Sequence, residues 1–459
     1  MALMPLNDSM FLLPESREQP MHVGGLQLFD LPAGTGKGYL RELYEASVSV
    51  TDVAPVFRKR PHRSPLTLGQ WTWVEDDEID LEHHVRHSAL PEPGRVRELL
   101  ALTSRLHGTL LDRKRPLWEA HLIEGLEGDR FAVYTKLHHA MMDGVSAMRL
   151  LTSSLSTDPA VRDVTLPWEA RAPRSPRRRS GGSPLGLPGL ALPGLALQAG
   201  IDAVGLVPTL LKLASDGLSS QATVLPLQAP RSMLNVAITG SRRFAAESWS
   251  LARIKAVARA ADATVNDVVL AMCAGALRAY LLELDALPGA PLVAMTPVSL
   301  RTDDSDESTN AVGVILCNLA TDVEHPGARL VAIRQSMLAG KAALAGLNQA
   351  QVTALSAVAM APLLLNSLMA LHRVSPPPFN LVISNVPGSP VPLYWNGARM
   401  TGAYPLSIPL DGQAMNITLA SYDGRVDVGI VGCRRSVPRL QRLLGHLEES
   451  LAGLESAVL

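Results

Sequence analysis

The fold follows from one stretch of the sequence, residues 131–144, which reads FAVYTKLHHAMMDG. Its first residues alternate and are rich in β-formers, so they predict a strand over Phe131 to Leu137. After the polar loop at 138–144, apolar side chains recur at helical spacing and predict a helix, at Val145, Met148, Leu151 and Leu155. A strand, a polar loop and a helix in this order commonly hold catalytic groups at the edge of a sheet.

Segments later in the chain add further helices and strands. Thr264 is a predicted N-cap of a helix that runs to about Leu284. Residues 416–422 and 425–431 flank Asp423-Gly424, which is a strong signature of a β-hairpin. Because helices and strands are interspersed, we expect an α/β or α+β fold.

The composition bounds the class of protein. The length of 459 residues is enough for two or three domains. The hydrophobic fraction of 47% is too high for a disordered chain. Its 42 Lys and Arg residues balance 43 Asp and Glu residues, so it lacks the surplus of positive charge that binding to nucleic acid requires. We therefore expect an aliphatic, near-neutral globular protein.

The composition changes sharply near Glu169. Residues 171–183 read RAPRSPRRRSGGS, a stretch that cannot bury a core and predicts a linker or an exposed crossover. We place an N-terminal domain at 1–168, the linker at 169–233 and a C-terminal domain at 234–459. The arginines fit a solvated loop, and the alternative is that they contact anionic lipid headgroups beside the apolar residues that follow.

Two apolar segments invite comparison with membrane spans. Val352 to Leu371 contains Pro362 and several polar residues, so we interpret it as a pair of buried helices. Leu185 to Ala214 is interrupted by proline and glycine, which argues against a spanning helix. We predict no integral membrane span and no signal peptide, and the three widely spaced cysteines suit a reducing cytoplasm.

The residues His138-His139-Ala140-Met141-Met142-Asp143-Gly144 are the candidate catalytic constellation. Histidine is a natural general base near neutral pH because its ordinary pKa lies close to that range. The carboxylate of Asp143 can fix the loop by pairing with an arginine, and Gly144 permits a tight turn into the helix. As a bare pattern these residues fit a structural role as well as a catalytic one, and their place between a strand and a helix favours the catalytic role.

HHAMMDG resembles the HHxxxDG motif of the bacterial wax ester synthase/diacylglycerol acyltransferases. The motif also recurs in chloramphenicol-acetyltransferase-like acyltransferases and in condensation domains. Further matches to the wax ester synthase family run in the family's order from about residue 5 to residue 440, at Met21-His22-Val23-Gly24, Pro116-Leu117-Trp118, Asn266-Asp267, Pro297-Val298-Ser299-Leu300-Arg301 and Ile383-Ser384-Asn385-Val386-Pro387-Gly388. One departure is Ser389, since the usual SNVPGP reads SNVPGS here.

This resemblance implies two domains of the chloramphenicol-acetyltransferase-like fold, with the histidine motif in a tunnel between them. His139 would take the proton from a long-chain fatty alcohol or from the free hydroxyl of a diacylglycerol. The alkoxide would then attack the thioester of a bound acyl-CoA in one ternary complex, without an acyl-enzyme. The reaction implies no cofactor and no metal, because acyl-CoA is itself a substrate.

The resemblance also implies supporting roles around His139. Asp143 would be an organiser that pairs with Arg301 of the other domain, and the alternative is that Arg301 is a surface charge. His138 would fix the loop. Candidate oxyanion donors are Asn266 and Asn385.

Other motif residues are assigned to binding or to structure. Asn266 and Asp267 have the alternative role of capping a helix. Pro116, Leu117 and Trp118 would shape the substrate cleft, with Trp118 in a packing role. The phosphates of CoA require fixed positive charge, for which Arg242 and Arg243 are the candidates.

Two other functions remain as alternatives. One is a condensation-type acyltransferase that depends on a carrier protein, and the other is a non-catalytic coat protein of lipid droplets. For the preferred acyltransferase we expect a cytoplasmic protein in peripheral contact with the inner membrane or with lipid inclusions. The charge-free residues 352–371 are a hypothetical wall of its acyl or alcohol tunnel.

Overall fold

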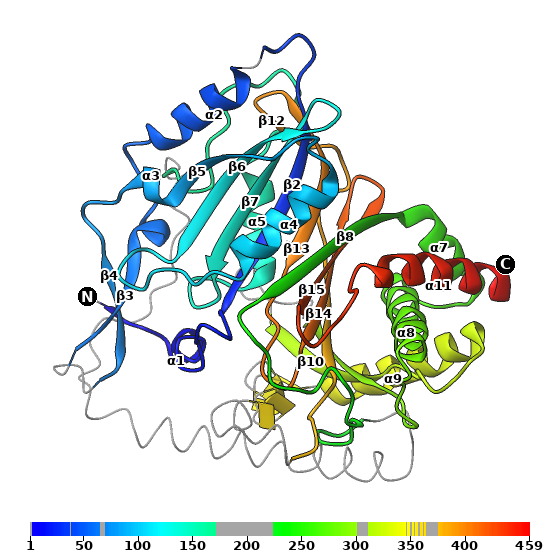
Figure 1. The fold of residues 1–459 in the computed structure, drawn as a ribbon. Coiled ribbons are helices and arrows are strands. Elements are labelled where there is room, and N and C mark those ends of the chain that lie inside the picture. The colour runs from blue at the N-terminus through cyan, green and yellow to red at the C-terminus, as the bar shows by residue number, and fades with distance from the viewer. Residues whose placement is uncertain are drawn as a thin grey trace.

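The computed structural model describes residues 2–36, 38–64, 69–170, 224–300, 311–345 and 375–459, together with most positions from 347 to 363. Two mixed six-stranded sheets lie side by side, and a three-stranded sheet accompanies the N-terminus (Figure 1). The Arg-rich residues 171–183, the apolar segment 185–214, Arg301 and the end of the predicted helical pair, 364–374, lie outside the described residues.

Strand order defines the three sheets. The first sheet has the order β12 (Tyr394–Trp395), β13 (Ala398–Leu406), β2 (His22–Asp30), β7 (Arg130–His138), β6 (Trp118–Leu126) and β5 (Val85–Ala89). The second has the order β10 (Ala311–Asn318), β9 (Val293–Leu300), β11 (Leu381–Val386), β14 (Met415–Tyr422), β15 (Arg425–Cys433) and β8 (Arg242–Ser250). The small sheet has the order β1 (Ala2–Leu3), β4 (Trp71–Glu75) and β3 (Lys59–Arg63).

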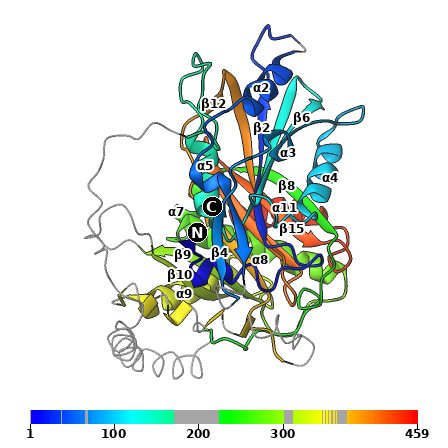
Figure 2. The same ribbon diagram turned by 90° about the vertical axis from the view of Figure 1, so that its left-hand side faces the viewer.

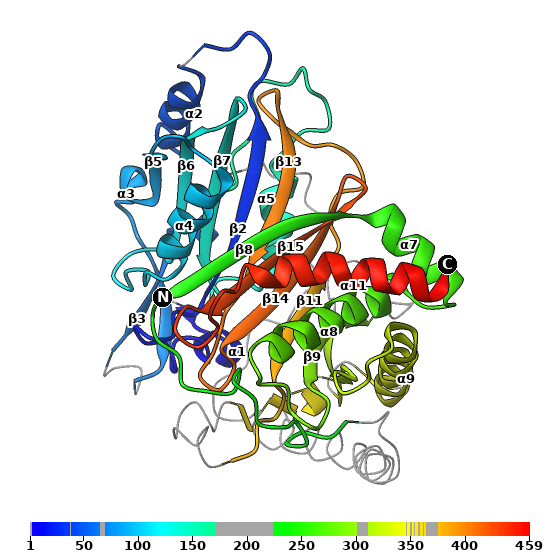
Figure 3. The ribbon, with the colours of Figure 1, turned by 45° about the vertical axis from the view of Figure 1, so that its right-hand side comes forward.

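Helices cover the sheets. Those of the first domain are α1 (Leu6–Ser9), α2 (Tyr39–Val48), α3 (Leu81–His84), α4 (Val96–His107) and α5 (Gly144–Ser153), with a 3-10 turn at Pro55–Arg58. Those of the second are α7 (Leu251–Ala260), α8 (Val265–Glu283), α9 (Pro326–Leu344) and α11 (Arg442–Val458). Figure 3 shows α8, α9 and α11 together against the second sheet, and buried residues of these helices share one core with its strands.

The predicted local elements are confirmed. The strand at 131–137 is β7, and the helix after the histidine motif is α5. Thr264 caps α8, with its side chain and that of Asp267 forming a reciprocal capping box. The hairpin is β14 and β15, whose turn residues Asp423 and Gly424 have φ of 43° and 75°, the left-handed region that a two-residue hairpin turn requires. The mixed α/β class is therefore as expected.

One segment of the predicted C-terminal domain lies in the sheet of the N-terminal domain. β12 and β13 come from the C-terminal half of the chain but complete the first sheet, where β13 pairs antiparallel with β2 from Leu406↔Gly24 to Arg399↔Asp30. Figure 2 shows this late strand pair among the blue strands of the first domain. The C-terminal half of the chain therefore contributes two strands to the first sheet, a connection that the composition of the sequence does not indicate.

Among the described residues, one helix is long and apolar enough to cross a membrane by length and composition. This is α8, and 72% of its most hydrophobic window is buried inside the protein. Its residues Val268, Leu270 and Leu277 are fully buried in the core of the second domain.

Candidate active site

Strand alternation at the end of β7 sends the two motif histidines to opposite faces of the first sheet. Val133 and Leu137 pack in the cluster that includes Met148 of α5, whereas Tyr134 packs in the cluster that includes Leu99 of α4. By the same alternation, residue 138 belongs to the α4 face and residue 139 to the α5 face. The fold thus separates the two histidines before any chemistry is considered.

A cavity of about 380 Å³ lies between the two sheets on the α5 side. Its lining is mostly apolar and comes from both halves of the chain, with Phe11, Met21, Val23, Leu137, His139, Asp143, Met148 and Leu151 on one side and Met295, Pro297, Met360, Val382, Ser384, Asn416 and Thr418 on the other. Met360 belongs to the predicted apolar segment at 352–371, so one residue of that segment contributes to the wall. The histidine motif therefore meets an apolar space between two domains, as the resemblance implies.

His139 is held at this cavity by its backbone and by an aromatic contact. Its backbone N–H donates to the carbonyl of Met21 at 2.9 Å, and its ring stacks on Phe11 with centroids 3.9 Å apart and planes 20° apart. Its Nδ1 is enclosed and receives no hydrogen bond from another described residue. The stacking contact therefore orients the ring, and no described side chain forms a hydrogen bond with it.

Burial lowers the pKa of His139 to about 4, although its own backbone carbonyl and the charge of Asp143 oppose this shift. A histidine with this pKa is neutral at pH 7, because desolvation penalises the charged imidazolium. A neutral imidazole has a free lone pair on one nitrogen, which is what a general base needs. The site thus holds a neutral imidazole at the cavity near pH 7.

His138 is fully buried and its imidazole is bonded at both nitrogens. Its Nδ1 accepts from the N–H of Ala140 at 3.0 Å, and its Nε2 lies 3.1 Å from Oε1 of Glu15. Because Nδ1 is an acceptor, the proton sits on Nε2 and is donated to Glu15. His138 also ties the loop to β6, since its backbone N–H donates to the carbonyl of Leu117 at 2.9 Å. These bonds agree with the predicted loop-fixing role.

Glu15 is a supporting residue that sequence reasoning missed. Its carboxylate is 2% exposed and accepts from Nε of Arg113 at 2.9 Å and from the N–H of Met21 at 3.1 Å, besides His138. Burial alone raises the pKa of Glu15, but the hydrogen bond from His138 and the charge of Arg113 hold the pKa below its ordinary value. Glu15 therefore fixes His138 and also Met21, whose carbonyl holds His139. No local pattern marks it, since it lies 123 positions from His138.

Asp143 is the N-cap of α5. Its Oδ1 accepts from the N–H of Ser146 at 2.7 Å, and the side chain is exposed at the rim of the cavity. Its predicted partner Arg301 lies outside the described residues. Gly144 begins α5 without a positive φ, and a Cβ there would meet nothing within 4 Å. The turn into α5 therefore does not use the conformational freedom that was predicted for Gly144.

The Pro116-Leu117-Trp118 motif supports the site from behind. Trp118 is fully buried, donates from Nε1 to the carbonyl of Phe57 at 2.9 Å and stacks on Trp168. The described cavity lining includes none of the three motif residues. Their contribution is packing and the backbone bond to His138, not contact with the cavity.

The two predicted oxyanion donors lie away from the cavity. Val382, Ser384 and Val386 of β11 line it, so alternation turns Asn385 to the face that α8 covers. Asn266 belongs to the first turn of α8, next to the capping-box Asp267. The described lining includes neither asparagine. The helix-capping role that the sequence left open for the Asn266-Asp267 pair is seen at Asp267, which closes the capping box with Thr264.

The two arginines predicted to bind the phosphates of CoA differ in burial and in hydrogen bonding. Arg242 is 5% exposed and donates to the carbonyls of Thr239 and Glu18, the latter at 2.7 Å, so it joins the two domains. Burial lowers the pKa of Arg242 to about 10. Arg243 is half-buried. Arg242 is therefore buried and held by two backbone carbonyls, a position that fits a structural role better than binding of a phosphate.

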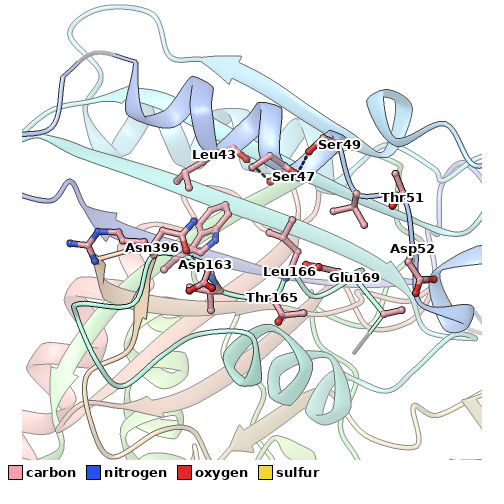
Figure 4. Close-up of a pocket in the computed structure, with 16 residues that line it drawn as sticks. Leu43, Ser47, Ser49, Thr51, Asp52, Asp163, Thr165, Leu166, Glu169 and Asn396 are labelled. Carbon is pink, nitrogen blue, oxygen red and sulfur yellow. Dashed lines mark hydrogen bonds between the residues drawn. The ribbon is translucent and has the colours of Figure 1, made fainter. Parts of the chain in front are cut away.

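A second, more polar hollow of about 670 Å³ lies between α2 and residues 162–170 (Figure 4). Asp52, Asp163, Glu169 and Asn396 line it, and none of the predicted site residues does. Among the residues that the structure describes, no group of three or more His, Cys, Asp or Glu side chains could hold a metal ion. Of the predicted site residues, His139, Asp143 and Gly144 line the histidine cavity, and none lines the second hollow.

Comparison with known proteins identifies the family. The model of the wax ester synthase/diacylglycerol acyltransferase catalytic domain matches residues 3–269, and that of the family's C-terminal domain matches residues 308–455. The chain belongs to this family. This acyltransferase is 55% identical, over the full length of both chains, to "Probable diacyglycerol O-acyltransferase tgs2" of Mycobacterium tuberculosis strain ATCC 25618 / H37Rv.

Solved structures agree with this assignment. The wax ester synthase/diacylglycerol acyltransferase from Marinobacter aquaeolei VT8 is 44% identical to this acyltransferase, with a TM-score of 0.80 and full coverage of both chains. The first condensation domain of the CDA synthetase is 15% identical with a TM-score of 0.56, covering 99% of this chain and 95% of that one, which shows a shared fold. The predicted two-domain fold and acyltransferase activity are confirmed.

Proposed function

We propose that the protein transfers a long-chain acyl group from acyl-CoA to the free hydroxyl of diacylglycerol, and that it also accepts a long-chain alcohol. The observation that carries this proposal is a neutral, immobilised histidine at an apolar cavity between two domains. The mycobacterial relatives, which are 55% identical and named as diacylglycerol O-acyltransferases, support diacylglycerol as the main acceptor.

His139 acts as the general base in this proposal. The acceptor hydroxyl gives its proton to the free ring nitrogen of His139 while its oxygen attacks the thioester carbonyl carbon. The tetrahedral intermediate then expels CoA thiolate by breaking the C–S bond, and the imidazolium returns the proton to the sulfur. Both substrates are held together, so no acyl-enzyme forms and no cofactor is needed.

The low pKa of His139 keeps the base neutral before the reaction and favours the second proton transfer, while it lowers the driving force of the first. A base with a pKa of about 4 is fully neutral when the acceptor binds. Once protonated, it is a stronger acid than an ordinary imidazolium, which favours return of the proton to the leaving thiolate. The apolar lining also excludes water, which would otherwise compete as an acceptor and hydrolyse the thioester.

Binding of CoA and cellular placement belong to the same proposal. Of the two predicted phosphate ligands, Arg243 is the one that is only half-buried, and no described residue bonds to its side chain. We retain the expectation that the protein works in the cytoplasm, in peripheral contact with the inner membrane or with lipid inclusions, where its acceptors are dissolved.

The test uses purified protein with palmitoyl-CoA and either dioleoylglycerol or hexadecanol, following free thiol and ester product. A general base contributes roughly 10²–10⁴-fold, so His139→Ala should lower kcat by about that factor with both acceptors. Thermal unfolding of the variant controls for loss of structure. Turnover by His139→Ala within a few-fold of the unsubstituted chain would contradict the base assignment.

A further inference from the structure

The second sheet contributes apolar residues to the cavity and, among the described lining residues, three polar ones. These are Ser384 on β11 and Asn416 and Thr418 on β14. The two strands are parallel neighbours, with Ser384 in register with Thr418 and Val382 in register with Asn416. Alternation places the three polar side chains on one face, and we call them the polar patch.

Within the polar patch, one hydrogen bond orients the amide. The hydroxyl of Thr418 donates to Oδ1 of Asn416 at 2.9 Å. Since Oδ1 is thereby identified as an acceptor, Nδ2 of Asn416 is the end that remains to donate. No described residue accepts a hydrogen bond from this Nδ2 or pairs with the hydroxyl of Ser384. The patch therefore offers two neutral donors to whatever fills the cavity.

Burial makes these donors selective. Asn416 is 4% exposed and Ser384 is half-buried, and their surroundings in the cavity are apolar, including Val382 and Met295. A donor that loses water to an apolar ligand and finds no acceptor carries a desolvation cost. A ligand that presents an oxygen at this place avoids the cost, so the patch discriminates between an alkyl chain and an ester.

We propose that the polar patch binds an ester carbonyl oxygen of diacylglycerol and so selects diacylglycerol over a long-chain alcohol. This inference rests on the proposed function, in which the acceptor hydroxyl lies at His139. A diacylglycerol carries two ester carbonyls besides that hydroxyl, whereas a fatty alcohol has only methylene groups to place against the patch. A site built to hydrogen-bond a substrate group rejects the analogue that lacks it.

The test compares kcat/KM for dioleoylglycerol and for hexadecanol, with palmitoyl-CoA as the common donor. Asn416→Leu removes the donor and keeps the branched shape of the side chain, Thr418→Val removes the group that orients it, and Ser384→Ala removes the second donor. Thr296→Val is the matched control, because Thr296 lies on β9 between the cavity residues Met295 and Pro297 and so faces the other side of the sheet.

Selectivity is the expected readout. The dioleoylglycerol-to-hexadecanol ratio should fall about tenfold in Asn416→Leu and severalfold in Thr418→Val and Ser384→Ala, while Thr296→Val leaves the ratio unchanged. A merely structural effect of the substitutions would lower both reactions together and leave the ratio constant.

Two results would overturn the inference. An equal loss with both acceptors would mean that the patch acts on the shared thioester or on folding, and an unchanged ratio in all three variants would mean that it binds no acceptor group. Ser384→Ala and Thr418→Val are mild enough to give folded protein if Asn416→Leu does not. Absence of turnover with either acceptor in the unsubstituted chain would instead contradict the proposed function.

Discussion

His138 and His139 are adjacent in sequence, but the fold gives them opposite environments. His138 is enclosed on the α4 face, where Ala140 and Glu15 occupy both of its ring nitrogens. His139 lies on the cavity face, where it is stacked on Phe11 and bonded to no described side chain. The difference is that both ring nitrogens of His138 are bonded within the loop, whereas the ring of His139 is left at the cavity, where our proposal assigns it the chemistry.

The largest effect should come from removing Glu15, the hydrogen-bond partner of His138, and should appear in the free energy of unfolding. Glu15→Ala leaves Arg113 without its carboxylate partner and His138 without its acceptor. Breaking a buried ion pair costs about 3–5 kcal/mol, and the low end applies here because Arg113 is 36% exposed and can be rehydrated. Urea denaturation should show a loss of about 3 kcal/mol for Glu15→Ala and a smaller loss for Glu15→Gln, which keeps an acceptor oxygen. Equal stability of Glu15→Ala and the unsubstituted chain would show that the buried network is not required.

A smaller effect, on kcat, should come from removing the aromatic contact of His139. Phe11→Ala removes the ring that stacks on His139. Aromatic contacts of this kind contribute about 0.5–1.5 kcal/mol, so kcat should fall by up to about tenfold. Phe11→Tyr keeps the ring and is the control, with kcat expected close to that of the unsubstituted chain. If Phe11→Ala and Phe11→Tyr have the same kcat, the stack does not position the base.

Asp143 separates two explanations of the motif. If its main role is to cap α5, Asp143→Asn should keep stability because asparagine is an equally good cap, while Asp143→Ala should lose about 1 kcal/mol. The unfolding midpoints of the two variants give this comparison. Loss of activity in a fully stable Asp143→Asn would instead support the ion pair with Arg301 that the resemblance implies.

The smallest expected effect is one of pH. Burial lowers the pKa of His139 to about 4, so the base is already neutral at pH 6 and gains nothing as the pH rises to 8. A histidine at its ordinary pKa of about 6.5 would be roughly three-quarters protonated at pH 6 and would show a clear rise. We expect kcat/KM to change less than twofold between pH 6 and pH 8. A fourfold rise across this range would show that the base titrates as an exposed histidine.

The sequence predicted the elements that depend on neighbouring residues. Alternation in β7, the capping box of α8 and the Asp423-Gly424 turn are local patterns, and each appears as expected. The same alternation could have excluded Asn385, since Ser384 and not Asn385 faces the cavity.

Other parts of the site depend on contacts that sequence does not display. Glu15 reaches His138 across 123 positions, and β13 inserts beside β2 from the far end of the chain. The bond between Thr418 and Asn416 was also missed, because its meaning appears only once β11 and β14 lie side by side at the cavity. Long-range pairing of this kind is fixed by tertiary packing and leaves no periodic trace in composition.

The central claim is that His139 performs the chemistry and His138 holds the loop. The most direct test measures kcat of His139→Gln and of His138→Gln side by side, with palmitoyl-CoA and dioleoylglycerol as substrates. Each kcat is corrected for the folded fraction of the variant. The account predicts that His139→Gln loses at least about 100-fold in kcat with little change in unfolding midpoint. His138→Gln should lower the midpoint and retain most of its kcat per folded molecule. The reverse pattern, with a stable but inactive His138→Gln and an active His139→Gln, would contradict the account.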